Sequence, residues 1–167
     1  MKHHIRRLMT VALLASTFAT MGIAQTQNRP PVPVKVQVVI SRYEGEKKVS
    51  SLPYTLAVTA NERGGNLRMG SEIPIPNGSG GYTLRSVGTN IDADVTSLDD
   101  IRYKVRVSIQ DSSVMERRAI DNVPTFRNFY TDNSVILRDG QSVQYTAAAD
   151  KNTGEVVKVD VTLTVEK

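Results

Sequence analysis

Apolar and polar residues alternate along most of the chain with a period of two. The clearest run is 101–109, where apolar side chains alternate with basic and hydroxyl-bearing ones, and 156–165 repeats the pattern near the carboxyl terminus. Alternation of this kind, rich in β-branched residues, is typical of strands with one face in a core and the other in water. No stretch keeps the period of a helix over the length of one. The pattern therefore predicts an all-β protein.

Turn sequences divide the rest of the chain into further short runs of the same character. The other predicted strands are 34–40, 52–60, 67–75, 82–87, 89–95, 126–130, 133–137 and 142–149. Pro74 and Pro76 confine 67–75 to a sheet edge or a bulge. The polar stretch 110–122 is predicted as a long loop or a short helix. About 7–10 short strands separated by turns predict an antiparallel β-sandwich or a barrel-like sheet.

Residues 1–24 have the three parts of a cleavable secretory signal peptide. A basic head is followed by an apolar, small-residue run over 8–23, and Gly22-Ile23-Ala24 supplies the small residues that favour cleavage before Gln25. An uncleaved membrane anchor is the alternative, but the run is short for a span of about 20 apolar residues. The sequence thus predicts an exported protein that resides in the periplasm, at the outer membrane or outside the cell.

The organisation behind the signal peptide is simple. Residues 25–33 are polar and Pro-rich, which predicts a flexible leader. Residues 34–167 are predicted to form one β domain, a length that suits a single core.

Removing the signal peptide also removes much of the chemistry that side chains could supply. It carries three of the 21 basic residues, so 18 remain against 17 acidic ones. This near balance gives no basis for predicting general nucleic-acid binding, which needs a basic face. His3 and His4, the two histidines, leave with it, and the chain has no Cys. Histidine- and cysteine-based catalysis, thiol redox chemistry, disulfides and zinc binding by these residues are therefore excluded.

The acidic residues offer two candidate sites. Asp92 and Asp94 share one face of a predicted strand, and Asp99 and Asp100 follow within a turn, so they could bind calcium or act as a glycosidase acid and base. Residues 150–155 resemble the start of a calcium loop without its terminal Glu. A solvent-facing strand and a hairpin turn explain these two groups better.

Two further segments invite a catalytic interpretation and do not sustain it. The glycine-rich residues 78–81 lack the Gly-Lys-Ser/Thr ending of a phosphate loop and read as a connector. Ser112 and Ser113 with Lys104 do not form a Ser-x-x-Lys motif. We therefore predict no catalytic, cofactor-binding or metal site, no bound cofactor, and a protein that is not an enzyme.

Four segments between 68 and 143 are similar to segments of a known protein family and follow one another in the same order. They are 68–75, the Val87-Gly88-Thr89 segment up to Val95, 103–114, and 124–143 with its Asp139-Gly140-Gln141 turn. In that order they resemble the carboxy-terminal homology region of bacterial secretins, the outer-membrane ring proteins of type II and type III secretion and of type IV pili. The resemblance implies a short, free-standing secretin-like β domain with a role in envelope assembly or secretion.

The leading functional hypothesis is thus an exported, non-enzymatic envelope protein that acts by strand pairing, docking or self-assembly. Its expected partners are envelope or secretion-system proteins or further copies of itself, with contact to the outer membrane but not to nucleic acid. The first alternative is a β-sandwich that binds a small molecule or carbohydrate; the candidate stacking residues are Tyr54, Tyr82, Tyr103, Phe126, Phe129 and Tyr130. Core and cross-strand packing would explain the same residues. The second alternative is an enzyme that uses carboxylates alone.

Overall fold

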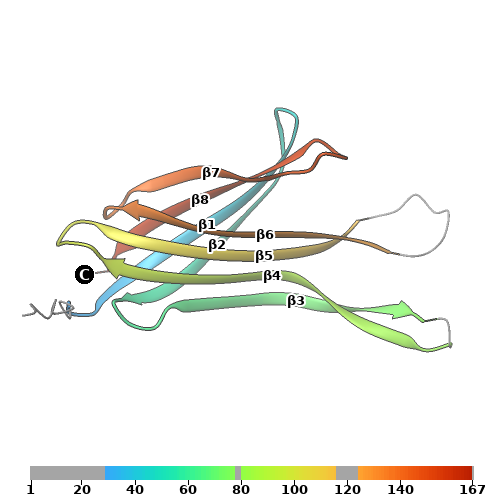
Figure 1. Ribbon diagram of the computed structural model, residues 1–167, viewed down its shortest axis with the longest axis horizontal. Coiled ribbons are helices and arrows are strands. Elements are labelled where there is room, and N and C mark those ends of the chain that lie inside the picture. The colour runs from blue at the N-terminus through green and yellow to red at the C-terminus, as the bar shows by residue number, and fades with distance from the viewer. Residues whose placement is uncertain (1–28, 78–79, 116–123, 167) are drawn as a thin grey trace, which may run out of the picture.

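The computed structural model describes residues 29–77, 80–115 and 124–166. The predicted signal peptide, the first part of the predicted leader and the centre of the glycine-rich connector lie outside the described residues. The described chain folds into eight antiparallel strands in two four-stranded sheets (Figure 1). Sandwich is therefore the correct one of the two predicted architectures, because strand pairing does not link the two sheets in the described part. No helix among these residues is long and apolar enough to span a membrane.

The strand order places the first and last strands side by side. Sheet A has the order β2-β1-β8-β7, formed by β1 (Val32–Glu44), β2 (Lys47–Ala60), β7 (Ser142–Ala149) and β8 (Glu155–Val165). Sheet B has the order β3-β4-β5-β6, formed by β3 (Gly65–Pro76), β4 (Tyr82–Ser97), β5 (Tyr103–Met115) and β6 (Thr125–Leu137). The chain passes from sheet A to sheet B after β2 and returns after β6. Each sheet therefore has two edge strands.

One hydrophobic core lies between the sheets, and the alternation seen in the sequence supplies it. The most deeply buried side chains are Val34, Val36, Val38, Val159, Val161 and Leu163 from sheet A, and Ile91, Val105, Val107, Ile109 and Leu137 from sheet B. Burial of one such side chain contributes roughly 1.5–3 kcal/mol. These residues hold the two sheets together over most of their length.

The strands are longer than the sequence predicts. Residues 82–87 and 89–95 belong to one strand, β4, and 126–130 and 133–137 belong to β6. Residues 110–115 continue β5 instead of forming a loop or helix, because residues 125–130 of β6 pair with them along the whole segment. The remainder of that prediction, 116–122, lies outside the described residues.

The predicted turns and the predicted edge strand are confirmed. Gly45, Gly140 and Gly154 have positive φ angles of 61°, 72° and 71° in the turns after β1, β6 and β7. Glycine adopts such angles without steric strain. β3, which ends in Pro74 and Pro76, is an edge strand of sheet B. Proline is tolerated at an edge, because no strand on the free side needs the N–H group that proline lacks.

Sheet B divides at one end into two ribbons. β4 pairs with β5 only as far as Gly88, whereas β3 and β4 stay paired with each other out to Pro76 and Tyr82. Figure 1 shows the β3–β4 and β5–β6 hairpins running apart at this end. Gly70 and Gly88 face each other where the ribbons separate, and a Cβ on Gly88 would overlap the Met69 carbonyl and the Gly70 Cα. The two strands can approach this closely only because both residues are glycine.

Candidate functional site

The aspartates singled out from the sequence lie on the surface. Asp92 and Asp94 occupy the outer face of β4, where Asp92 forms an ion pair of 2.7 Å with Arg68. Asp99 accepts hydrogen bonds from the backbone N–H groups of Ile101 and Arg102 in the turn after β4. The Arg102 side chain is the main cause that lowers the pKa of Asp99. Among the described residues no three His, Cys, Asp or Glu side chains gather where a metal ion could bind.

The other predicted chemistry also resolves into turns and strands. Asp150 begins the β7–β8 hairpin turn and accepts from the Asn152 N–H (2.8 Å), the main cause that lowers the pKa of Asp150. Ser112 hydrogen-bonds to Gly88, not to a lysine, at 3.1 Å. Lys104 lies at the other end of β5, roughly 25 Å along the strand. Lys104 and Ser112 are therefore too far apart to form a Ser–Lys pair.

The candidate stacking aromatics do not share a groove. Tyr54, Tyr103 and Phe129 are buried in the core, whereas Tyr82 and Tyr130 are exposed. Phe126 packs beneath the Arg85 guanidinium, 4.3 Å from the ring centre. Core packing therefore accounts for half of the set, and the structure does not assemble a carbohydrate platform from the rest.

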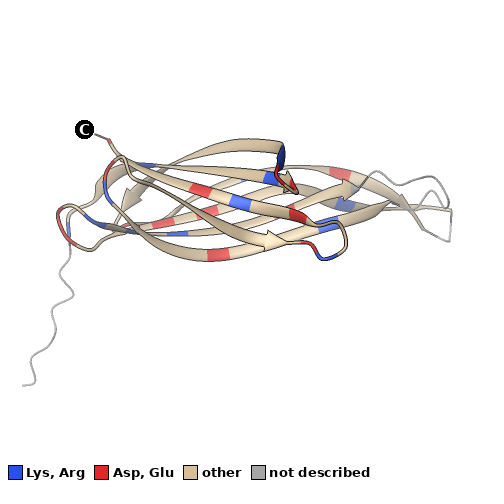
Figure 2. Ribbon diagram, turned by 90° about the horizontal axis from the view of Figure 1, so that it is seen from above, with Lys and Arg blue, Asp and Glu red and all other residues tan. Residues whose placement is uncertain are grey.

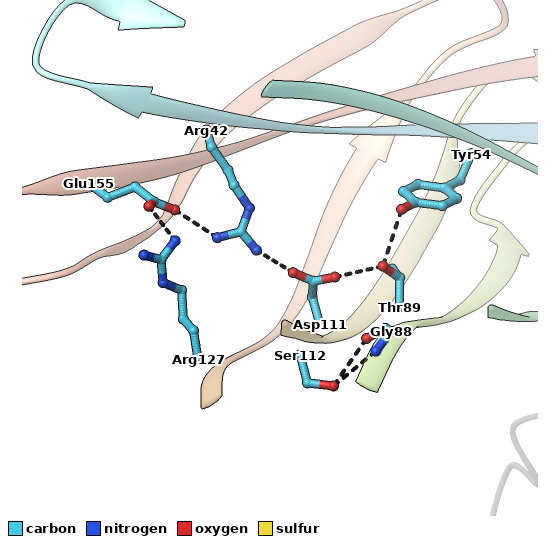
Figure 3. Close-up of polar contacts among 8 residues, drawn as sticks. All are labelled: Arg42, Tyr54, Gly88, Thr89, Asp111, Ser112, Arg127 and Glu155. Atoms are coloured by element: carbon cyan, nitrogen blue, oxygen red, sulfur yellow. Dashed lines mark hydrogen bonds and ion pairs between the residues drawn. The ribbon is translucent and has the colours of Figure 1, made fainter. Parts of the chain in front are cut away.

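The most unusual site in the described structure is a charged network inside the sandwich (Figure 3). Arg42 of β1 donates to Asp111 of β5 and, at 2.7 Å, to Glu155 of β8. Arg127 of β6 donates to the second carboxylate oxygen of Glu155. The side chains of Arg42, Asp111 and Glu155 are only 14%, 12% and 7% exposed. Because Arg42–Asp111 and Arg127–Glu155 each join one sheet to the other, the network ties the sheets together.

Neutral hydroxyls extend this network into the core. The Thr89 hydroxyl donates to Asp111 at 2.6 Å and shares a 3.1 Å hydrogen bond with the Tyr54 hydroxyl. Thr89 pairs with Asp111 in the β4–β5 ladder, one residue beyond Gly88. The network therefore closes the core at the end where sheet B divides. We name Arg42, Asp111, Arg127 and Glu155 the inter-sheet network.

Sequence reasoning missed the inter-sheet network, although the alternation contains a signal for it. Each of the four residues continues the inward-facing phase of its strand. Arg42 follows Ile40, Asp111 follows Ile109, and in the same way Arg127 precedes Phe129 and Glu155 precedes Val157. Charged residues in an apolar phase must be paired when they are buried. Two bases and two acids at strand ends therefore predict ion pairs, but not which residues are partners.

The network is suited to structure and not to acid–base chemistry. Both buried carboxylates accept hydrogen bonds from arginine, so these interactions occupy their oxygens. Elsewhere, basic and acidic residues are interspersed along the strands (Figure 2). The outer face of sheet B shows this in the Arg106–Asp132 pair (2.6 Å). The charges thus stabilise the fold without creating a surface of one sign.

Two tyrosines with buried hydroxyl groups, one attached to the inter-sheet network and one outside it, provide a matched test. Tyr54→Phe removes the hydrogen bond to Thr89 and should cost about 1 kcal/mol in the free energy of unfolding. Tyr145→Phe should be neutral or stabilising, since the buried Tyr145 hydroxyl has no hydrogen-bond partner in the described structure. Burial is the main cause that raises the pKa of Tyr145, and the nearby Asn133 side chain lowers this pKa in part. The Asn133 amide group donates its hydrogen bond to Thr131, at 2.7 Å.

Urea denaturation at neutral and alkaline pH measures both effects. Because the pKa of Tyr145 is raised in the folded state, its contribution to stability is complete below the unfolded value of about 10 and is lost as pH rises above it. Tyr145→Phe should therefore lose less stability than the wild type at alkaline pH. Equal costs of the two substitutions at neutral pH would contradict the assignment of partners.

A cleft of about 290 Å³ adjoins the inter-sheet network on the side where β6 and β7 are edge strands. Arg42, Arg127 and Glu155 form part of its wall, and the end of β7 contributes Ala148 and Ala149. A second depression, of about 430 Å³, lies at the other end of the sandwich, beside Tyr103 and the turn after β4. Arg29 and Pro30 border this second depression.

Solved structures identify the class of protein that this fold resembles, the secretin domains of bacterial secretion systems. The type II secretin GspD from enteropathogenic Escherichia coli has a TM-score of 0.51 and 9% identity, over 83% of this chain and 70% of its own. The InvG secretin domain β-barrel of the Salmonella SPI-1 injectisome has a TM-score of 0.49 and 10% identity, over 82% of this chain. This chain spans 61% of InvG.

The similarity lies in the fold. At 9% identity, the GspD comparison confirms the secretin resemblance expected from the sequence as a likeness of structure. No family model and no curated protein matches the chain by sequence.

Proposed function

We propose that the protein is an exported, non-enzymatic component of the bacterial envelope that acts by pairing its edge strands with other proteins or with further copies of itself. Residues 1–24 serve as the export signal, 25–33 as a leader and 34–167 as the assembling domain. The secretin-like fold supports a role in envelope assembly or secretion, at or near the outer membrane. The single observation that carries the proposal is the unprotected edge of β7.

Natural sheets block unwanted pairing with charges and prolines on their edge strands. Three of the four edges here are blocked in this way. β2 has Lys47, Lys48 and Pro53; β3 has Arg68, Glu72, Pro74 and Pro76; β6 has Arg127 and Asp132. β7, with the sequence Ser-Val-Gln-Tyr-Thr-Ala-Ala-Ala, has neither a charge nor a proline. Its free side is therefore the edge best suited to accept another strand.

The ladder shows which groups of β7 are available. Gln141 accepts a hydrogen bond from the Leu163 N–H (3.2 Å) just before the strand begins. Since bonded and outward-pointing residues alternate in an antiparallel pair, Val143 and Tyr145 bond to β8. The backbone groups of Ser142, Gln144 and Thr146 then point to the free side. They provide N–H and C=O groups for a partner strand.

A proline at Gln144 tests this proposal directly. Gln144→Pro removes one outward-pointing N–H and should reduce assembly of the mature chain (25–167) to monomers, with little loss of stability. Size-exclusion chromatography with light scattering, together with cross-linking in envelope extract, measures the assembled fraction. Gln144→Ala is the matched control, since it loses the same side-chain contact to Asp160 (2.9 Å) but keeps the N–H. A wild-type chain that stays monomeric and cross-links to no envelope protein would refute the proposed function.

A further inference from the structure

The cleft beside β7 has the composition of a binding site and not of a simple packing defect. Its apolar lining comes from Phe129, Ala148, Ala149 and Val157, and its polar lining from Arg42, Arg127 and Glu155, with Asn128, Tyr130 and Asp150 beside them. Tyr130 is largely exposed, so its ring is available to a molecule that enters the cleft. An apolar floor with a few polar groups is the usual character of a ligand site.

One donor in the wall of the cleft lacks an acceptor. Arg127 donates through Nη1 to Glu155, but its Nε–H is buried and has no hydrogen-bond partner among the described residues. A buried donor without an acceptor destabilises the state that contains it. The Arg127 side chain lines the cleft and is 25% exposed, so its guanidinium group is accessible from the cleft. A ligand that supplies an acceptor here would relieve the defect.

The surrounding charges decide what kind of acceptor fits. Arg42 and Arg127 are already balanced by Asp111 and Glu155, and Asp150 adds a further negative charge at the cleft. A carboxylate would be repelled by the unbalanced Asp150. An ammonium group cannot accept from Arg127. An uncharged carbonyl oxygen can accept from Arg127 and is not repelled by Asp150. Proteins present such a carbonyl in every main-chain amide.

We propose that this cleft binds an uncharged main-chain amide that carries an apolar side chain, presented by an extended segment of a partner protein. The carbonyl accepts from Arg127 Nε, and the side chain packs on Ala148 and Val157. The free edge of β7 leads into the cleft at Ala149, so a strand that pairs with β7 places one of its residues there. The proposal that the segment belongs to a strand paired with β7 rests on the proposed function. The proposal that the cleft binds a neutral amide does not.

The test uses three small leucine derivatives that share the side chain and differ in charge. N-acetyl-L-leucinamide is neutral, N-acetyl-L-leucine is anionic and L-leucinamide is cationic. In NMR titrations of the mature chain, the neutral probe should shift the Arg127 Nε–H resonance and the amides of Ala148 and Ala149. The two charged probes should bind at least about tenfold more weakly. Equal binding of all three probes, or no shift at these positions, would overturn the proposal.

Two variants locate the binding. Ala148→Leu fills the apolar floor and replaces no residue of the inter-sheet network, and it should abolish the shifts caused by the neutral probe. Arg127→Lys keeps the charge but lacks Nε, and it should weaken binding at least about tenfold, whereas Arg106→Lys on the outer face should not. Unchanged binding by Ala148→Leu would exclude this cleft. Because the probes are monomeric, their binding does not depend on assembly through β7.

Discussion

Replacing Arg42 by Met is expected to destabilise the protein by about 3 kcal/mol, at the lower end of the range for removing one partner of a buried ion pair. Met retains much of the apolar stem, so the loss comes from the charge and its hydrogen bonds. Among the described side chains, Asp111 then keeps only the Thr89 hydroxyl as a partner, and Glu155 keeps only Arg127. Urea denaturation of the wild type and the variant measures the difference in the free energy of unfolding.

The matched control for this substitution is Arg106→Met. Arg106 also forms an ion pair with an aspartate, Asp132, but its side chain is 57% exposed. Exposed pairs contribute little to stability, because water and salt screen them, so Arg106→Met should cost much less than Arg42→Met. If Arg42→Met and Arg106→Met cost the same, the inter-sheet network does not hold the sheets together.

A methyl group at Gly88 should be nearly as damaging. Gly88 has a φ of 144°, a conformation that other residues adopt only under strain, and the added Cβ would overlap the backbone of Met69 and Gly70. Gly88→Ala should therefore cost about 3 kcal/mol, the strain and the clash together. Hydrogen exchange should show the largest loss of protection in β3 and β4, and urea denaturation should show the loss of stability.

Gly140→Ala separates these two contributions. Gly140 also has a positive φ, 72°, but no atom lies within 4 Å of the position that a Cβ would occupy. Its substitution should cost only the backbone strain, about 1 kcal/mol. Comparable losses for the two alanine variants would show that β3 and β4 do not approach each other as closely as described.

Alternation of apolar residues was sufficient to locate the strands that build the core. The runs 34–40 and 156–165 fall on β1 and β8, and 103–109 of the run 101–109 falls on β5, because each strand has a buried face that demands a period of two. Ile101 lies in the turn before β5 and is exposed, so its prediction as the first inward-facing residue of that strand was wrong. Pairing across long distances was not readable from any local pattern. β4 continues through Gly88 because it pairs with β3 there, and β5 continues to Met115 because it pairs with β6 there. Local composition at these positions favours a break.

The candidate sites show the opposite limit. Asp92 and Asp94 drew attention because they are close in sequence, yet on an outward face water and Arg68 satisfy them. Arg42 and Glu155 lie far apart in sequence, and only the pairing of β1 with β8 brings them together. The phase of each strand predicts that these charges point inward. Topology, which the sequence left open, decides which charges meet.

The central position of β8 has a consequence for how the chain folds. β1 and β8, the first and last described strands, pair along most of their length, so sheet A cannot be completed until β8 is available. Sheet B is built from successive neighbours and can begin from local hairpins. Distant pairing of this kind folds slowly, in milliseconds to seconds. If the chain crosses a membrane amino-terminus first, β1 emerges long before β8. The side of β1 that pairs with β8 then lacks its partner strand until β8 has also crossed.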